Sequence, residues 1–312
     1  MNKLAHDLAL QAAVKPRFRG HRNMLPRARA QYPYNLEREY LRIVNAYMAL
    51  LKKTVSERMK PIYEMLEVER KATISQEGYR LDDFSAFAGI FFNMGSRIMR
   101  AFWDMQIAFE REALAFNLDR RIRRIANQTR NLSISQWRRL VNASIGINLL
   151  EGYYKGEFFR HSLARWVDTN VRLIKSVPQT SLVGMRNIVQ ESWQQGLTRR
   201  ELAKRLERAY EINRNRAQFW ATDQLANLNA DIAKQQQEDA GVQEYVWSTS
   251  GDERVRDSHV ELDGKRFSWV SPPEVAPGRH CHPGKDYRCR CVALPVFNLP
   301  GLSLPWEKGE QK

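Results

Sequence analysis

Residues 247–259 read Trp-Ser-Thr-Ser-Gly-Asp-Glu-Arg-Val-Arg-Asp-Ser-His, and the character of the chain changes at this stretch. Before it, apolar residues recur at helical spacing. After Gly241, short β-favouring runs at 245–247, 266–270 and 292–297 alternate with Gly and Pro clusters. Pro295 would confine the last run to a sheet edge or a bulge. The sequence therefore predicts a mainly α protein with a small, mostly β C-terminal module, α+β overall.

The helical part of the chain carries several boundary signals. A first helix is expected from about Leu36, with a kink at Pro61, and a second over 81–127. Ser133 with Gln136 reads as a capping box that opens another helix, and Pro178 separates that helix from one at 181–195. Gly196 is a natural C-cap, and it is followed by a second capping box, Thr198 with Glu201. A last helix is expected over 213–239.

These patterns divide the chain into four segments. We expect a basic extended arm at 1–32, an α-helical body at 33–241, the β module at 242–300 and a polar tail at 301–312. The most apolar stretch, 84–96, is shorter than the roughly 20 residues of a spanning helix, so we expect no membrane span. The start of the chain shows no signal-peptide pattern, and three clustered cysteines fit a reducing cytoplasm.

The formal net charge of +15 is concentrated in two places. Residues 1–32 and 119–139 each carry seven basic side chains against one acidic side chain. Such runs indicate a polyanion such as DNA, although 119–139 can equally be a solvated helix face and the arm can equally bind an acidic protein surface. The candidate phosphate-binding residues are Arg17, Arg19, Arg22, Arg27, Arg29, Arg120, Arg121, Arg123 and Arg124.

The module also concentrates metal-binding residue types. All three cysteines and three of the six histidines lie between 259 and 291. Cys289 and Cys291 are two residues apart on an expected strand, so both can reach one ion, and a tetrahedral zinc needs two more ligands. The candidate ligands are His259, Cys281, His282, Cys289 and Cys291, with His280 as a further donor nearby. The alternative is that the thiols are small buried hydrophobes and His259 is hydrogen-bonded into the fold.

The charged turn before His259 has two interpretations. Arg254 and Arg256 would lie on one side and form forks onto Asp252 or Asp263, which gives an ion-paired structural turn that includes Gly264. The alternative is a catalytic acid–base cluster with His259 as the base. A related alternative is an HNH-like, metal-dependent nuclease in which His259 activates water. We favour the structural turn, because no nucleophile or second base lies at a recognisable spacing.

The order of these pieces resembles the C-terminal signature of tailed-phage minor head proteins, the Mu F-like head morphogenesis family. The pieces are Gly196-Leu-Thr-x-x-Glu-Leu202, a long Ala-rich helix ending at Gly241, Tyr245-x-Trp247, Asp252-x-Arg254-x-Arg256-x-x-His259, Asp263-Gly264 and Cys289-Arg290-Cys291. Two features depart from the family pattern, namely Ala221-Thr-Asp-Gln224 and Cys281 between two histidines.

The resemblance implies a non-enzymatic minor capsid protein of the virion. Such a protein would assemble in the host cytoplasm and sit inside the capsid near the portal vertex, where it assists head assembly and DNA packaging or ejection. The implied partners are the portal protein, the major capsid or scaffolding protein and double-stranded DNA. The cofactor that we expect is zinc in a structural role, on the evidence of the clustered cysteines and histidines.

Overall fold

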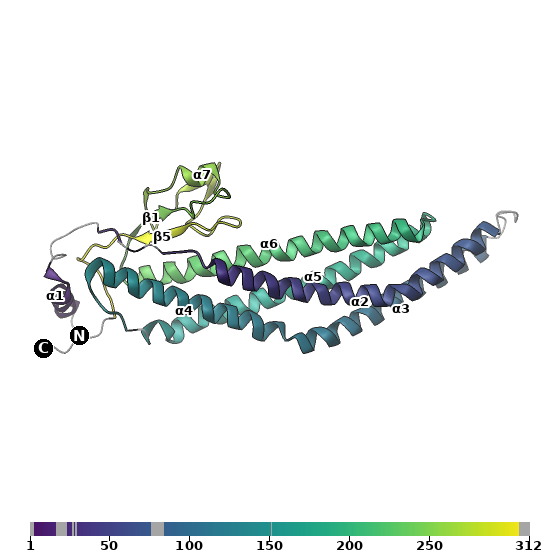
Figure 1. Ribbon diagram of the computed structural model, residues 1–312, viewed down its shortest axis with the longest axis horizontal. Coiled ribbons are helices and arrows are strands. Elements are labelled where there is room, and N and C mark those ends of the chain that lie inside the picture. Colours follow the sequence, from purple (N-terminus) through teal and green to yellow (C-terminus); the bar gives the residue numbers. More distant parts are fainter. Residues whose placement is uncertain are drawn as a thin grey trace. The chain divides into compact units, whose positions relative to one another are not determined.

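The computed structural model describes residues 3–16, 24–26, 28, 30–75, 84–150 and 152–305. Helices dominate, and short strands follow them in the C-terminal module, so the expected α+β class is confirmed (Figure 1). None of the described helices combines the length and apolar character needed to cross a bilayer. The long helices are α1 (Lys3–Ala13), α2 (Tyr34–Ser75), α3 (Phe84–Phe116), α4 (Leu118–Ile145), α5 (Glu157–Gln194) and α6 (Arg199–Asp239).

The chain forms two compact units that share the long helices. Unit 1 comprises Met1–Tyr40, Ile122–Asp168 and Thr222–Lys312, and unit 2 comprises Leu41–Arg121 and Thr169–Ala221. In unit 2, segments of α2, α3, α5 and α6 bury a common apolar core. Its aromatic pair, Tyr47 on α2 and Phe109 on α3, has ring centroids 5.5 Å apart. The bundle thus forms as the helical periodicity predicts, because each helix hides its apolar stripe against the others.

Unit 1 contains the C-terminal module and a core that gathers distant parts of the chain. Trp137 of α4 stacks on Phe297 at 5.9 Å and donates from its indole N–H to the Tyr154 hydroxyl at 2.8 Å. Leu10 and Val14 are buried in the same cluster. The expectation of an extended arm over 1–32 is therefore wrong for Lys3–Ala13, which form α1 because one face of this segment is apolar enough to pack there.

Three of the expected helix ends are confirmed. Gly196 adopts φ 64° after α5, and the Leu197 N–H donates to the Ser192 carbonyl at 2.9 Å, as in a Schellman motif. The Thr198–Glu201 capping box forms, with the Thr198 N–H donating to Glu201 Oε2 at 2.9 Å. Gly241 ends α6 with φ 76°, and a Cβ at this position would lie 2.3 Å from the Gly301 carbonyl oxygen. Each of these helix ends is specified by residues next to it in the sequence, so local geometry is enough to form it.

Other expected boundaries are wrong. The helix expected over 81–127 is broken at Asn117, which takes φ 52° and caps α4 by accepting the Arg120 N–H at 3.2 Å. Pro178 lies inside α5 and does not end it. A proline in a helix interior costs about 3 kcal/mol, but Ile174 and Val177 beside it are fully buried, and their burial offsets that cost. Likewise α6 is continuous from Arg199 and does not start at 213.

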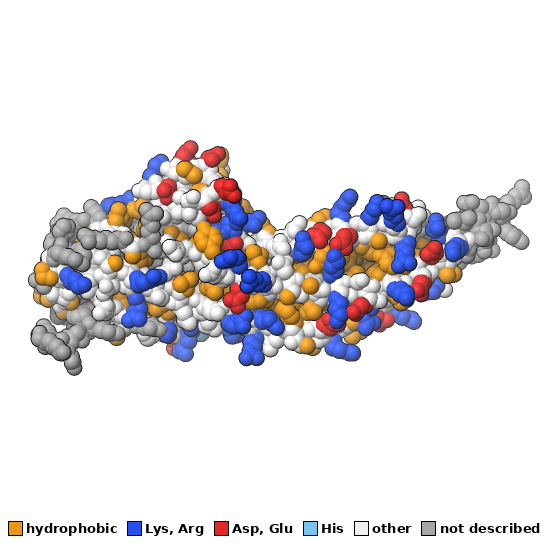
Figure 2. Space-filling view, in the orientation of Figure 1, with side chains coloured by type: hydrophobic (Ala, Val, Ile, Leu, Met, Phe, Trp, Pro, Cys, Tyr) orange, Lys and Arg blue, Asp and Glu red, His pale blue; other side chains and the backbone are white. Residues whose placement is uncertain are grey.

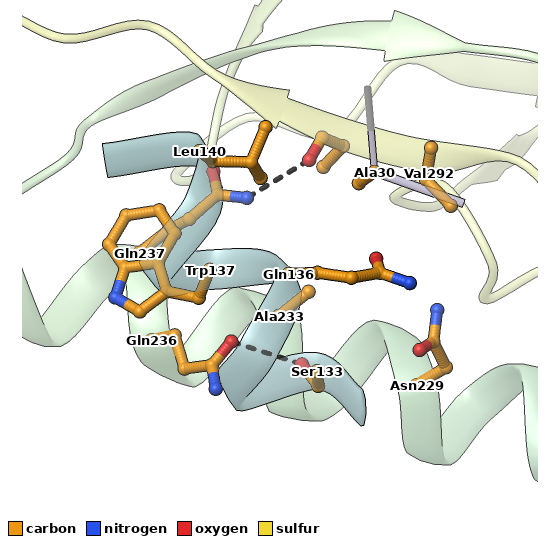
Figure 3. A pocket seen from close by; sticks show the side chains of 11 residues that line it. Ala30, Ser133, Gln136, Trp137, Leu140, Asn229, Ala233, Gln236, Gln237 and Val292 are labelled. Carbon is orange, nitrogen blue, oxygen red and sulfur yellow. Dashed lines mark hydrogen bonds between the residues drawn. The ribbon is translucent and has the colours of Figure 1, made fainter. Parts of the chain in front are cut away.

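Ser133 does not begin a helix, so the capping box expected there does not form. It lies in the middle of α4, and its hydroxyl donates to Gln236 Oε1 on α6 at 3.0 Å (Figure 3). The two side chains line a polar cavity of about 30 Å³ between α4, α6 and the start of the last strand, together with Gln136 and Asn229. A tertiary hydrogen bond therefore uses the hydroxyl that the sequence pattern assigned to a helix cap.

The module is built from five short strands. β1 (Glu244–Ser248) lies between β2 (Arg266–Ser268) and β5 (Val292–Pro295) in one antiparallel sheet, and β3 (Glu274–Ala276) pairs with β4 (Arg279–His280). Pro295 is on the edge strand, as expected. The sheet lies beside α6 (Figure 1), where the Gln237 amide donates to the Ala293 carbonyl at 3.0 Å and accepts the Trp269 indole N–H at 3.3 Å. Gln237 thus ties the module to the helix.

A buried ion pair links the module to the start of α2. The Arg290 guanidinium donates to both carboxylate oxygens of Glu37, at 2.9 Å and 2.7 Å, and the two side chains are 9% and 8% exposed. The rings of Tyr32 and Tyr34 lie 5.8 Å and 5.9 Å from the same guanidinium. The pair is therefore enclosed, and each charge depends on the other.

We expect Glu37→Gln to lower the free energy of unfolding by about 3–5 kcal/mol, because it leaves the buried Arg290 charge unpaired. Equilibrium urea denaturation of the full chain measures this change. The matched control is Glu39→Gln, since Glu39 pairs at 2.7 Å with Arg124, whose side chain is 57% exposed. The control change should stay below about 1 kcal/mol. Equal losses in the two variants would contradict the assignment of Glu37 as a buried anchor.

Candidate metal centre

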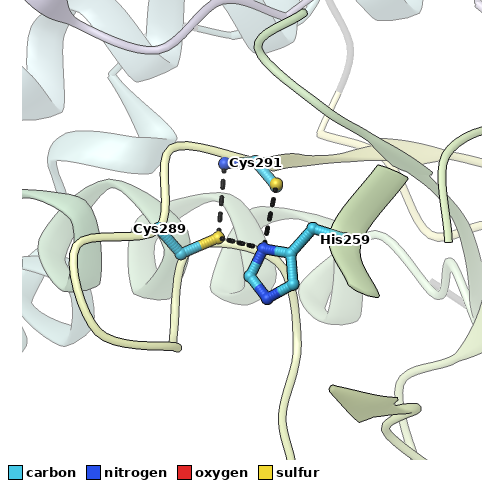
Figure 4. Close-up of side chains that lie close together, drawn as sticks. All are labelled: His259, Cys289 and Cys291. Carbon is cyan, nitrogen blue, oxygen red and sulfur yellow. Dashed lines mark hydrogen bonds between the residues drawn. The ribbon is translucent and has the colours of Figure 1, made fainter. Parts of the chain in front are cut away.

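Three side chains converge inside the module. His259 lies on the short helix α7 (Asp257–Val260) and is 2% exposed. Its Nδ1 lies 3.6 Å from the Sγ atoms of both Cys289 and Cys291 (Figure 4). The three donor atoms all lie within 4.8 Å of one another. One nitrogen and two sulfurs in a buried cluster are the donor set of a metal centre for a borderline-soft cation.

The local backbone explains why the two thiols meet His259. Cys289 and Cys291 flank Arg290 in an extended segment that leads into β5, so their side chains share one face while Arg290 faces Glu37. The preceding loop approaches α6 closely, and a Cβ on Gly284 would lie 2.9 Å from the Cβ of Ala230. Gly284 also has φ 80°, a conformation that favours glycine. The turn therefore leads into a segment, just before β5, in which Cys289 faces inward.

Asp286 orients His259 from the opposite side of the ring. The His259 Nε2 lies 3.2 Å from Asp286 Oδ2, and the Asp286 side chain is 1% exposed. Arg256 and Arg279 donate to the same carboxylate at 3.3 Å and 3.2 Å. A carboxylate is an acceptor, so the ring proton belongs on Nε2, and the lone pair of Nδ1 faces the two sulfurs. This carboxylate–histidine arrangement is typical of metal-ligating histidines.

The two thiols are electrostatically distinct. The Cys291 thiol donates to Cys289, and this hydrogen bond, helped by the backbone N–H groups of Gly284 and Cys291, lowers the pKa of Cys289 despite its burial. The same hydrogen bond, together with burial, raises the pKa of Cys291. The Gly284 and Cys291 N–H groups donate to Cys289 Sγ at 3.4 Å. Cys289 therefore lies in an environment that stabilises a thiolate, the form that binds metal.

The distances match those of a tetrahedral site. With Zn–N near 2.0 Å, Zn–S near 2.3 Å and tetrahedral angles, neighbouring nitrogen and sulfur ligands are about 3.5 Å apart. Both nitrogen–sulfur distances in the cluster are 3.6 Å. The three residues form a possible metal site that is compatible with zinc.

Three of the five candidate ligands are brought together, and two are not. Cys281 is half-buried and packs against the apolar cluster that contains Cys289 and Cys291. His282 instead lies against Tyr245, with its Nδ1 2.9 Å from the Tyr245 hydroxyl. Burial lowers the pKa of His282 to about 4. His282 is therefore a neutral packing partner of the aromatic residues of the module.

The arginine side chain of the charged turn binds a different acceptor from the one expected. Asp252 accepts the Arg254 N–H at 3.2 Å, and Asp263 accepts the Thr249 N–H at 2.7 Å, so both carboxylates bind backbone. The expectation that Arg256 pairs with Asp252 or Asp263 is wrong, because its guanidinium reaches Asp286 and the Tyr287 carbonyl. Sequence reasoning missed Asp286 altogether. Its signal was weak, since it is an unremarkable Asp three residues before Cys289.

The candidate phosphate-binding arginines fall into two groups. Arg17, Arg19, Arg22, Arg27 and Arg29 lie outside the described residues. In α4, the Arg121 guanidinium lies 4.4 Å from the Phe116 ring centroid, and Arg124 pairs with Glu39. Arg120, Arg121, Arg123 and Arg124 are all exposed. On the face shown in Figure 2, basic side chains are interspersed with acidic and apolar ones.

Residues 184–294 match the model of the family described as Phage Mu protein F like protein. This part of the chain is similar to Mu F-like proteins. The resemblance predicted from the sequence is thus confirmed, and the match includes α6, the strands β1–β4, most of β5 and every residue of the His259–Cys289–Cys291 cluster. The chain is also similar to an uncharacterized protein of Haemophilus influenzae, with 38% identity over 129 residues. That similarity covers 41% of this chain and 28% of the relative. No solved structure gives a significant match.

We expect Asp286→Asn to lower the free energy of unfolding by about 1–3 kcal/mol, because the buried acceptor shared by His259 and two guanidinium groups loses its charge. Thermal or urea denaturation checks this. Asp263→Asn is the matched control, since its amide oxygen can still accept the Thr249 N–H at an exposed site. A loss confined to less than about 1 kcal/mol in both variants would show that Asp286 does not organise the cluster.

Proposed function

We propose that this chain is a minor capsid protein of a tailed bacteriophage that acts in head morphogenesis. The observation that carries the proposal is the Mu F-like match over residues 184–294, which runs from the end of α5 through α6 into the strands of the module. We place the protein inside the head near the portal vertex, and in the host cytoplasm during assembly. Its proposed partners are the portal protein, the major capsid or scaffolding protein and double-stranded DNA.

The geometry favours an architectural role over a catalytic one. A general base must reach a substrate proton, whereas His259 is 2% exposed and both ring nitrogens face side chains of the module. The HNH-like nuclease alternative needs His259 and the 280–282 histidines beside one metal. His282 instead bonds to Tyr245, and His280 is exposed with its Nδ1 3.3 Å from the Pro272 carbonyl oxygen.

We further propose that zinc occupies the His259–Cys289–Cys291 cluster and acts structurally. The apolar core of the module is small, and modules of this size gain stability from a metal or another cross-link. A bound zinc would join α7 to the segment that leads into β5, two parts otherwise connected through loops. The metal would supply folding free energy there, and the side chains around it would exclude water.

The role in head morphogenesis predicts a particle phenotype. A phage with an early stop codon in this gene should yield few DNA-filled heads, and complementation in trans with the wild-type chain should restore them. Electron microscopy and packaged DNA measure the defect, and immunoblots of purified particles test the location.

Two controls separate the alternatives. Complementation with His280→Gln should succeed, because His280 is exposed and lies outside the cluster. Normal yield of filled heads without the protein, or absence of the protein from precursor and mature particles, would overturn the proposal. Cleavage of plasmid DNA by the purified chain with a divalent metal, abolished by His259→Gln, would favour the nuclease instead.

DNA contact through the arm predicts salt-dependent binding that ignores sequence. If each of Arg17, Arg19, Arg22, Arg27 and Arg29 neutralises one phosphate, changing all five to Gln should reduce the slope of log K against log salt by about 4–5. Fluorescence anisotropy over a salt series measures this. The matched control changes five exposed basic residues of unit 2, namely Arg58, Lys60, Lys204, Arg205 and Arg208. Equal slopes for the wild-type chain and the arm variant would contradict the contact.

A further inference from the structure

Three donors leave one position of a tetrahedral site to be filled, and the fold limits what can fill it. The remaining donors of the loop are His280, Cys281, His282 and Asp286. Asp286 is occupied by His259 Nε2, Arg256 and Arg279. His282 is held between Tyr245 and Trp269, with ring centroids 5.5 Å and 4.9 Å away. His280 is exposed on β4. Each of these three donors is thus committed elsewhere or faces solvent.

Cys281 lies against the cluster itself. Its side chain is half-buried and packs on the apolar group that contains Cys289, Cys291 and Trp247. It is also close enough to interact electrostatically with Cys289, Asp286, Arg279 and Arg256. Its thiol is not among the three donors that lie within 4.8 Å of one another, so ligation requires the side chain to move inward.

The charges around Cys281 favour a third thiolate. Zinc bound by one neutral imidazole and three thiolates carries a net charge of −1, and Asp286 adds another −1. Arg256 and Arg279, which both bind Asp286, supply +2 and balance the group. With only two thiolates, the metal, its ligands, Asp286 and the two arginines would together carry a net charge of +1. Three thiolates therefore bring the formal charge of the group to zero, with both guanidinium groups partly exposed to solvent.

We propose that Cys281 is the fourth ligand, so that the module holds zinc through three cysteines and His259. This inference rests on the proposed zinc site and specifies its ligand set. On binding, Zn²⁺ forms one bond to each sulfur and one to Nδ1, and each thiol that binds releases its proton to solvent. No electron transfer is involved. The result is a closed structural site with no position left for water.

The first experiment uses the full-length wild-type chain, so folding of a variant is not at issue. The metal-free and Zn²⁺-loaded proteins are treated with iodoacetamide, and each cysteine is followed by peptide mass spectrometry. We expect Zn²⁺ to protect Cys281, Cys289 and Cys291 together. If Zn²⁺ protects Cys289 and Cys291 while Cys281 reacts at its metal-free rate, the fourth-ligand proposal is overturned and the zinc site stands. If the chain takes up no Zn²⁺, both proposals fail.

The second experiment counts sulfur ligands with Co²⁺, whose thiolate charge-transfer absorption grows with the number of bound sulfurs. Cys281→Ser should lose about a third of this intensity, as one of three thiolates disappears. His282→Gln is the control from the same loop and should keep the wild-type spectrum, because His282 bonds to Tyr245. Cys281→His should retain tetrahedral Co²⁺ with the lower intensity. Full intensity in Cys281→Ser would exclude Cys281 as a ligand.

Discussion

The alternation of side chains along Cys289-Arg290-Cys291 is the constraint on which unit 1 depends. An extended segment sends successive side chains to opposite faces. The two thiols therefore face His259, while Arg290 faces Glu37 at the start of α2. One short segment thus holds the interior of the module with one face and the helical part of unit 1 with the other. A shift of one residue would turn the guanidinium toward His259 and both thiols toward Glu37.

Asp286 extends this constraint to the loops. It receives Arg256 from the turn before α7, Arg279 from β4 and His259 from α7 itself. A carboxylate with 1% exposure would be very costly alone, so the three donors and the acid require one another. The three loops are short and have little apolar area of their own. A shared buried charge is therefore what fixes their relative positions.

A closed, buried cluster suits a protein that must keep its shape. The same residue types in an open cleft would suggest hydrolysis. Here both ring nitrogens of His259 face buried side chains, so neither can reach a substrate. The long helices of the described chain provide extended surfaces, and the module is fastened to α6 through Gln237. This combination of long helices with a fastened module agrees with the role that we propose for this chain in a phage head.

The sequence by itself determined the class of the fold, the end of the helical region at Gly241, the Thr198–Glu201 cap and the clustering of thiols with His259. These features follow from local rules, since helical periodicity, glycine at positive φ and alternation along a strand act over a few residues. Only the tertiary structure decided the rest. Ser133 donates a hydrogen bond to Gln236 on another helix and does not cap a helix of its own. Pro178 lies inside α5, where its neighbours are buried. Arg256 binds Asp286. In each case the partner lies on another element, and a contact between distant parts of the chain overrides the local preference that the sequence displays.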